Sequence, residues 1–506
     1  MSAPLAAGPE AGGRDAATGG AWRIALLLAL IAAAGLIVEH HDAFAPLRFA
    51  VRRDGARMPS TVLTPELEIV SGLPIVSLYV SPRDLEDPAT GLLPNRLKHG
   101  REWERPGTVS FFEDGRLRFS SGVGVRFHGG GSRITVPEPG FRLYFRRKYG
   151  LAEAPAGAIF DPPHDHPLRR VILHNDVRGD RQMRWHLVNP LAYDIARAIG
   201  GITAATKPAR MFLNGEFQGV YVLSEHFHPT DYFETHWRHP VVLSGREFDE
   251  LWAELSKIEA PRMRNLAPLI DLDNMTRWFI ATIFCATGDP FQGPGQFRDP
   301  TRSERQWFWV NWDMDMSFRE WRHDTFVRVT ERIGERRRGR RASEPRAYLF
   351  TRLLAEDAEY REYFKRVWTE AMNHRIPPPF LRERFEHYRD IALRYGVADQ
   401  RYLPLLETFI ERRPETVRRY AEQWLNTPPS VRLRLSAGGR AVLVDGWRAG
   451  PGYEGHYFPG MRVSLSVPEE DRDDFAYWRV NGETAPTPEI IVGADRDLSV
   501  DAVWTE

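Results

Sequence analysis

Cysteine, lysine and net charge are all scarce in this sequence, and each scarcity excludes something. The single cysteine, Cys285, excludes an internal disulfide, and we expect it to pack in the core of an apolar helical stretch. Lysine and arginine total 68, as do aspartate and glutamate, so no nucleic-acid partner is expected. Arginine supplies nearly all the positive charge, which indicates a GC-rich bacterial genome. Lysine occupies only five positions, each a candidate phosphate ligand: Lys98, Lys148, Lys207, Lys257 and Lys365.

Long hydrophobic runs are absent except for one near the N-terminus. Residues 1–21 are rich in alanine and glycine and are expected to be disordered, and an apolar run of fifteen residues follows at 24–38. A membrane-spanning helix needs about 20 residues, whereas a shorter run suits a signal-peptide core. We expect residues 22–40 to be an uncleaved anchor in the bacterial cytoplasmic membrane, with the bulk of the chain outside the cytoplasm. A cleaved signal on a secreted protein is one alternative, and a buried helix of a soluble protein is another.

The remaining length predicts more than one folded unit. A chain of 506 residues, 42% of them hydrophobic, is globular and too long for a single core. We expect a linker over residues 41–70, a main domain over 71–427 and a small β module over 428–506. No internal repeat of 20–50 residues is visible.

The main domain combines a β-rich first half with a mainly helical second half. Asp114-Gly115 and Asn214-Gly215 each separate two apolar alternations, a pattern that predicts β-hairpins. Residues 184–201 predict a helix that closes on a glycine pair. Residues 240–425 are mainly helical, interrupted by a strand pair around 305–318. The predicted fold class is α+β.

Two aspartates stand one residue apart in the apolar pattern of that strand pair. Asp313 and Asp315 alternate with Trp312 and Met314, so in a strand both carboxylates face the same way. Like charges on a buried face are unfavourable unless a cation neutralises them, and Mg²⁺ is commonly held by one or two carboxylates plus phosphate oxygens. The pair therefore predicts a metal site. Salt bridges to nearby arginines such as Arg319 or Arg322 are the alternative.

Five stretches of the chain together resemble the spore-coat CotH kinase-like family. The resemblance covers about residues 72–370, most of the chain, and the stretches occur in the family's order: GREWERPGTVSFFEDG, GVGVRFHGGGSR, FRLYFRRKYG, RMFLNGEFQGVYVLSEHF and QWFWVNWDMDMSF. The resemblance implies an atypical protein-kinase-like fold, with a β-rich N-lobe, a helical C-lobe and nucleotide between them. It also implies a kinase that uses ATP and Mg²⁺ or Mn²⁺ to phosphorylate serine or threonine on a surface or secreted protein.

The resemblance assigns roles to particular residues. It implies that Asp313 and Asp315 hold the metal and that Asp289, after a helix over about 274–287, is the other functional aspartate. Glu225, following GVY at the crease between lobes, would bind metal, pair with a basic residue or help frame the adenine. Arg184 matches a recurrent arginine that pairs across the lobes. The alternatives are a turn residue at Asp289 and a strand-end surface carboxylate at Glu225.

Two departures from the family pattern bear on activity. Members commonly carry a lysine just before the FRLY strand, but this chain has the sequence EPG at residues 138–140. Arg142 is the nearest cation and takes the catalytic place beside Asp289, while Lys148 is a more distant candidate for binding nucleotide. The asparagine expected after Asp289 is also missing, and Gln296 is its candidate replacement. A catalytically inactive binding or scaffold protein of the envelope is therefore the alternative function.

The C-terminal residues, 428–506, predict a small all-β module. Its YFPG and WRVNG stretches resemble bacterial β-repeat modules of surface proteins, which implies a spacer or adhesion role. Trp447, Tyr457 and Trp478 are expected to fill a core too small for aliphatic side chains alone.

Overall fold

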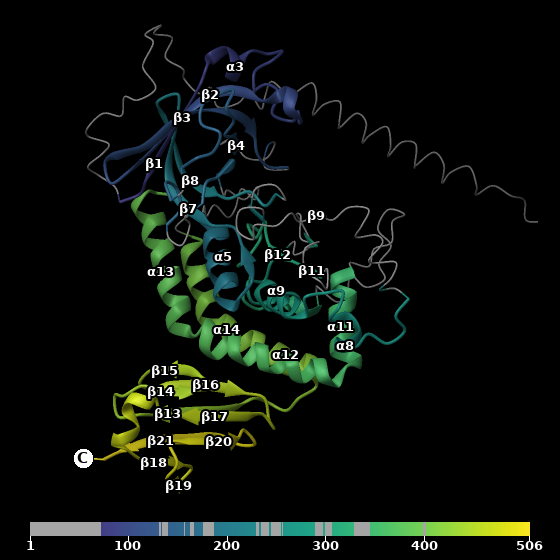
Figure 1. Cartoon of the computed structure of the whole chain (residues 1–506), viewed down its shortest axis with the longest axis vertical. Helices are drawn as coiled ribbons and strands as arrows, with labels where there is room; N and C mark the ends of the chain where they lie inside the picture. Colours follow the sequence, from purple (N-terminus) through teal and green to yellow (C-terminus); the bar gives the residue numbers. More distant parts are fainter. Residues whose placement is uncertain are drawn as a thin grey trace, which may run out of the picture. The chain divides into compact units, whose positions relative to one another are not determined.

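The computed structural model contains a β-barrel, a group of helices and further β-sheets (Figure 1). The structure describes residues 72–130, 133, 140–155, 157–161, 166–175, 187–228, 232–233, 242–243, 255, 257–288, 297–298, 306–327, 345–397 and 401–505. Within these ranges no helix is both long and apolar enough to cross a membrane. The predicted anchor, residues 22–40, lies outside them.

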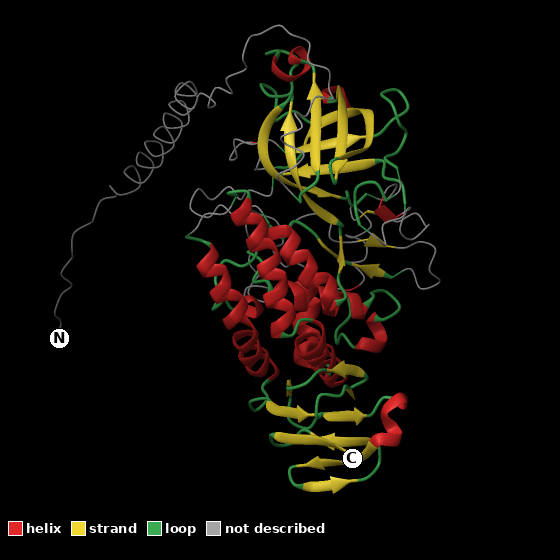
Figure 2. Cartoon of the chain, turned by 90° about the vertical axis from the view of Figure 1, so that its left-hand side faces the viewer, coloured by secondary structure: helices red, strands yellow, loops and turns green. Residues whose placement is uncertain are grey.

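The first part of the described chain is a closed barrel of seven strands (Figures 1 and 2). Neighbouring strands are antiparallel except β1 and β7, whose parallel pairing closes the barrel. In spatial order the strands are β1 (Ile75–Val80), β2 (Arg105–Glu113), β3 (Arg116–Phe127), β4 (Phe141–Tyr144), β5 (Arg170–His174), β8 (Glu216–Ser224) and β7 (Thr206–Leu213).

Both predicted hairpins are present and join neighbouring barrel strands. Asp114 and Asn214 have φ of +53° and +52°, and each is followed by a glycine that also has positive φ, as a two-residue hairpin turn requires. The Asn214 side chain also accepts a hydrogen bond from the Val80 N–H (2.8 Å) and donates one to the Val80 carbonyl (2.9 Å). This turn therefore holds the end of β1 against β7.

Barrel strands alternate between a filled interior and an outer surface that carries the charged side chains. On β4, Phe141 and Leu143 belong to the buried interior cluster, whereas Arg142 lies between them on the opposite face. On β8 the outward residues Val220 and Val222 belong to a second cluster, which the helices form. The outer side of β8 therefore packs on the helical region.

The helices of the second part share one core (Figure 2). The helix α5 ends at Gly200, whose φ of +100° gives the predicted glycine stop, and α9 begins after Asp271, whose side chain accepts from the Asn274 N–H. The helices are α5 (Val188–Ile199), α8 (Met263–Leu266), α9 (Leu272–Phe284), α11 (Pro345–Glu356), α12 (Ala358–Glu370), the π-helical turn η4 (Ala371–Arg375), α13 (Pro378–Arg394) and α14 (Leu403–Leu425).

Two strands are present in the region 305–318, but the prediction that they pair with each other is wrong. These two short strands, β11 (Trp307–Phe308) and β12 (Val310–Asn311), belong to different sheets. The first pairs with β10 (Phe297–Arg298), which in turn pairs with β9 (Val242–Leu243). The second pairs in parallel with β6 (Ile202–Thr203), directly after α5.

Residues 431–504 form two further sheets that pack around a separate cluster of buried residues. Tyr457 and Trp478 are fully buried there, as expected, but Trp447 is 36% exposed and the expectation for it is wrong. Its ring instead stacks on His374 of η4, with 5.9 Å between centroids. The five-stranded sheet has the order β16 (Tyr453–Tyr457), β13 (Val431–Ser436), β21 (Leu498–Trp504), β18 (Phe475–Val480), β19 (Glu483–Ala485); the four-stranded sheet has β15 (Trp447–Ala449), β14 (Val442–Val444), β17 (Arg462–Ser466), β20 (Glu489–Gly493). Together with the barrel and the helices, they confirm the α+β class.

Candidate active site

Asp313 and Asp315 lie on a turn, not on a strand. The strand β12 ends at Asn311, and Asp313 has a φ of +57°, in the left-handed region that ends extended structure. The alternation expected of a strand therefore does not apply, and both side chains are half-buried instead of lying on a buried sheet face. We call residues 312–318 the aspartate turn. The Asp313 N–H donates to the Tyr193 hydroxyl of α5 (3.2 Å).

The aspartate turn is hydrogen-bonded to the chain that leaves α9. The Gly288 N–H donates to the Met316 carbonyl (2.9 Å), and the Phe318 N–H donates to the Cys285 carbonyl (2.8 Å). The hydroxyls of Thr287 and Ser317 share a further hydrogen bond of 3.0 Å. Residues 285–288 and 316–318 thus run side by side. Asp289, which follows Gly288 in the sequence, lies outside the described residues.

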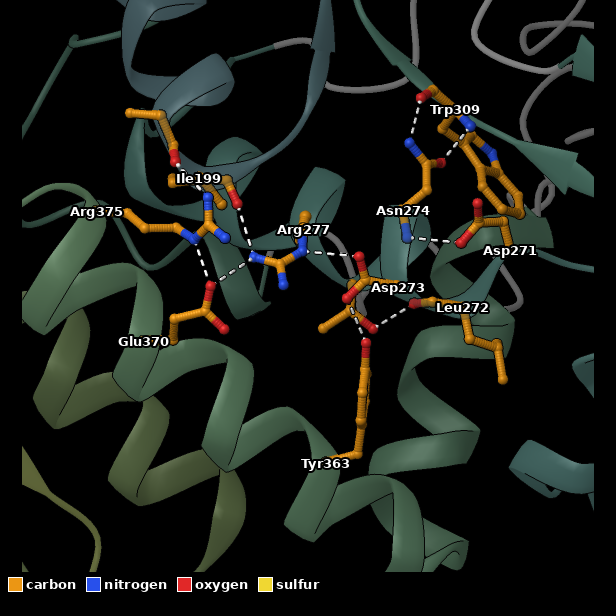
Figure 3. Close-up of polar contacts among 12 residues, drawn as sticks. Ile199, Asp271, Leu272, Asp273, Asn274, Arg277, Trp309, Tyr363, Glu370 and Arg375 are labelled. Atoms are coloured by element: carbon orange, nitrogen blue, oxygen red, sulfur yellow. Dashed lines mark hydrogen bonds and ion pairs between the residues drawn. The ribbon is translucent and has the colours of Figure 1, made fainter. Parts of the chain in front are cut away.

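The N-terminal half of α9 holds the strand that leads into the aspartate turn. Asn274 donates to the Trp309 carbonyl (3.0 Å) and accepts from the Trp309 N–H (2.6 Å), so one amide side chain satisfies both backbone groups (Figure 3). The Trp278 indole donates to the next carbonyl, that of Val310 (3.0 Å). Because all of these groups are buried, the register of 309–311 on α9 is fixed.

The last turn of α9 and the segment after the aspartate turn are joined by a buried arginine. Arg413 of α14 is fully buried. Its guanidinium donates to the carbonyls of Ile283 (2.5 Å) and Phe284 (2.9 Å) in α9. It also donates to the carbonyls of Trp321 and His323, both at 2.7 Å. Burial lowers the pKa of Arg413 to about 10, so it remains charged at neutral pH.

The salt-bridge alternative for the two aspartates fails for the arginines proposed. Arg319 contacts the Met316 sulfur (3.5 Å), and Arg322 lies over the Trp321 ring, 4.0 Å from its centroid. Within the described part of the chain, neither arginine forms an ion pair with Asp313 or Asp315.

Glu225 follows β8 at the end of the barrel and is 2% exposed, so it is not a surface carboxylate. Its Oε2 accepts from the Ala205 N–H (2.9 Å), and its own N–H donates to the Ala205 carbonyl (3.1 Å). The His166 Nε2 lies 3.7 Å from Oε1. One carboxylate oxygen is thus bound to the backbone and the other faces a histidine.

Arg142 belongs to a basic surface on the outer side of β3, β4, β5 and β8. Its Nη2 lies 3.0 Å from Nδ1 of His128, whose ring contacts that of His174 at 5.5 Å between centroids. The rings of His226 and His228 lie 5.7 Å apart just after β8. We call this surface the arginine–histidine face: Arg142, Arg170, His128, His174, His226 and His228.

The remaining predicted residues fall elsewhere. Lys148 is 3.5 Å from Glu104, which also binds Arg126 (2.7 Å) and Arg146 (3.3 Å), so the structure places Lys148 in an ion-pair network. Arg184 and Gln296 lie outside the described residues. Among those that are described, no group of three or more histidine, cysteine or carboxylate side chains has the arrangement of a metal site.

A family comparison decides what kind of protein carries these features. The family described as CotH kinase protein matches residues 125–241 and 243–427, more than half of the chain. The chain belongs to the CotH kinase protein family. No curated protein matches it.

In this CotH protein the histidines of the arginine–histidine face are uncharged at neutral pH. Burial lowers the pKa of His174 to about 4. Burial and, next, the charges of Arg142 and Arg170 lower the pKa of His226 to about 2. The pKa of His128 is also well below its usual value, mainly because the ring is buried and then because of Arg142. The face therefore presents two permanent charges and neutral imidazoles, a donor set suited to phosphate oxygens.

The same pKa values predict that this CotH protein is labile to acid. The pKa of His174 is about 4 in the folded protein and about 6.5 in the unfolded chain. Between pH 4 and pH 6.5 the unfolded chain therefore binds more protons than the folded protein. Stability therefore falls as the pH decreases from about 6.5 towards 4. We expect the melting temperature to drop by several degrees between pH 7.5 and pH 5, and His174→Gln to reduce that drop. The exposed His99→Gln is the matched control, and an equal pH profile for wild type and His174→Gln would contradict the assignment.

Sequence reasoning missed two residues that shape this CotH site, Asn274 and Arg413. Both lie within the family match, and both occupy the buried side of a helix. The spacing of Phe409, Arg413 and Val417 at four-residue intervals places the arginine in an apolar stripe of α14. An arginine in that position signals a buried structural role.

Proposed function

We propose that this CotH protein is a metal-dependent kinase that transfers phosphate from ATP to serine or threonine of a surface or secreted protein. In this proposal the barrel and the helical region are the two lobes of a kinase-like fold, and residues 431–504 are an appended β module. The N-terminal segment anchors the protein in the bacterial cytoplasmic membrane. The observation that carries the proposal is the aspartate turn, which three buried contacts fix beside the end of α9.

The residues of the aspartate turn suit the binding of Mg²⁺ or Mn²⁺ in a kinase site. Mg²⁺ usually takes one or two protein carboxylates and completes its shell with water and phosphate oxygens, so a cage of three or more side chains is not required. Asp313 and Asp315 are two such carboxylates, and both are half-buried. A metal bound there supplies charge neutralisation of the phosphate groups.

The other residues bind and orient the substrates in this proposal. Arg142 and Arg170 attract the phosphate oxygens, and Arg142 is oriented by its contact with His128. Asn274 and Arg413 fix the backbone on either side of the aspartates, so that the carboxylates need not reorganise when substrates bind. Asp289 remains the residue predicted to orient the attacking hydroxyl, on the strength of the family resemblance.

Nucleotide binding tests the proposal directly. ATP affinity of the full-length protein is measured by calorimetry with Mg²⁺, with Mn²⁺ and with EDTA. We expect binding to weaken by about tenfold or more in EDTA, because two carboxylates otherwise repel the phosphates at a cost of a kcal/mol or more, and a 1.4 kcal/mol difference is about tenfold in affinity. Transfer of the labelled γ-phosphate to protein is followed in parallel. Equal affinity with and without metal, or metal-dependent binding with no transfer, would favour the inactive binding protein.

A further inference from the structure

A small pocket on the outside of the barrel lies among four basic side chains. Its volume is about 110 Å³. It lies where the outer side of β3 and β4 meets residues 92–103, which precede β2. The residues that line it include Lys98, Trp103, Arg126, Arg133, Arg142 and Tyr144. We call it the oxyanion pocket.

The positive charge of the oxyanion pocket is largely uncompensated. Arg126 is neutralised by Glu104, whose Oε2 accepts from its Nε (3.1 Å) and Nη2 (2.7 Å). In the part of the chain that the structure describes, no carboxylate lies within ion-pair distance of Lys98, Arg133 or Arg142. Three like charges around one small cavity repel one another, and a bound anion would relieve that repulsion.

The guanidinium groups of Arg133 and Arg142 are held in place by groups other than carboxylates. Arg133 donates to the carbonyls of Phe127 (2.7 Å), Lys98 (3.0 Å) and Arg96 (3.1 Å). The carbonyl contacts fix the guanidinium while leaving its charge free. Among the described residues, the buried Nε atoms of Arg133 and Arg142 have no hydrogen-bond partner. The pocket is thus preorganised and retains donors for a ligand.

The size of the oxyanion pocket limits what it can hold. Liquid water takes about 30 Å³ per molecule, so the volume corresponds to three or four waters, close to one tetrahedral oxyanion. Pockets for drug-sized ligands have about 300–1,000 Å³, so a nucleotide does not fit within it. Lys98 and Trp103 precede residue 125, where the family match begins, whereas Arg126, Arg133 and Arg142 lie within the match.

We propose that the oxyanion pocket binds a single phosphate-class oxyanion, either free or carried on a side chain of a partner protein. Arginine and lysine donors around one cavity match the charge and tetrahedral acceptor geometry of such a group. The proposal goes beyond the kinase activity and does not depend on it.

Phosphate binding by a lysine variant tests the pocket. Inorganic phosphate and a phosphoserine peptide are titrated into the full-length protein in EDTA, at ionic strength held constant with chloride. We expect saturable binding that Lys98→Met weakens about tenfold, the effect of losing one charge-assisted hydrogen bond. Lys98 is exposed and has no ion pair among the described residues, so the variant should fold normally.

The controls separate this pocket from the aspartate turn. Lys257→Met changes another exposed lysine and should leave phosphate affinity unchanged. Asp315→Asn should also leave it unchanged in EDTA, whereas loss of binding in that variant would place the phosphate at the aspartate turn and overturn the proposal. Wild-type affinity in Lys98→Met, or no binding beyond that of chloride, would overturn it too. Tighter binding of the phosphopeptide than of inorganic phosphate identifies a protein-borne group, and the reverse identifies the free ion.

Discussion

Asp315→Asn is expected to abolish phosphoryl transfer and to leave the metal-free protein as stable as the wild type or slightly more so. Asparagine keeps the size of the side chain but removes a hard anionic ligand from the proposed metal. It also removes one of two like charges one residue apart on the aspartate turn. Loss of electrostatic stabilisation of a transition state typically lowers kcat by about 10²–10³-fold, so we expect transfer to fall at least that far.

Asp313→Asn is expected to behave in the same way, because asparagine tolerates the φ of +57° at that position as well as aspartate does. Melting temperature and transfer of labelled γ-phosphate are measured for both variants. Asp473→Asn changes an exposed carboxylate in the short 3₁₀ helix before β18 and is the control for the loss of one negative charge. A variant that unfolds more easily and still transfers phosphate would contradict a metal role and indicate a structural one.

Arg413→Met should destabilise the protein by about 3–5 kcal/mol. The methionine fills much of the space but removes the guanidinium hydrogen bonds to four carbonyls, those of Ile283, Phe284, Trp321 and His323. Each buried, unsatisfied polar group costs about 1–3 kcal/mol, and relief of the buried charge offsets part of the sum. Denaturant unfolding measures the change in free energy.

The neighbouring Arg412→Met is the matched control, since Arg412 is exposed and its loss should change stability by less than about 0.5 kcal/mol. Arg413→Lys keeps the charge, but an ammonium has three donors and cannot span carbonyls in two segments as a guanidinium does. We expect this variant to fold and to bind Mg²⁺–ATP more weakly. Full stability in Arg413→Met would show that water or a rearranged chain satisfies the carbonyls.

The elements that the sequence predicted correctly depend on local chemistry. The Asn214-Gly215 turn and the end of α5 at Gly200 need positive φ angles. Glycine and asparagine adopt such angles most readily, so these residues predict both features. The closure of the barrel was not predictable, because the β1–β7 pairing joins residues more than 130 positions apart. The expectation of a kinase-like fold came from the family resemblance, because periodicity alone does not predict it.

The geometry of the aspartate turn was not predictable from the sequence. The prediction of a strand through Asp313 fails because a residue with positive φ ends the extended structure. Hydrophobic alternation does not predict the φ angle of a single residue. Trp447 was placed in the wrong environment because an aromatic residue suits a small core and a docking surface equally well. Arg413 was overlooked because its partners are backbone carbonyls, which no side-chain pattern reveals.

The contact between η4 and β16 also bears on self-association of the protein. β16 is an edge strand of the five-stranded sheet, and an unpaired edge invites strand addition from another molecule. Asn373 donates to the His456 carbonyl (3.0 Å) and accepts from the His456 N–H (3.0 Å), so a side-chain amide occupies the place of a neighbouring strand. At the opposite edge, β19 is only three residues long. Neither edge of this sheet is a free template for fibril growth.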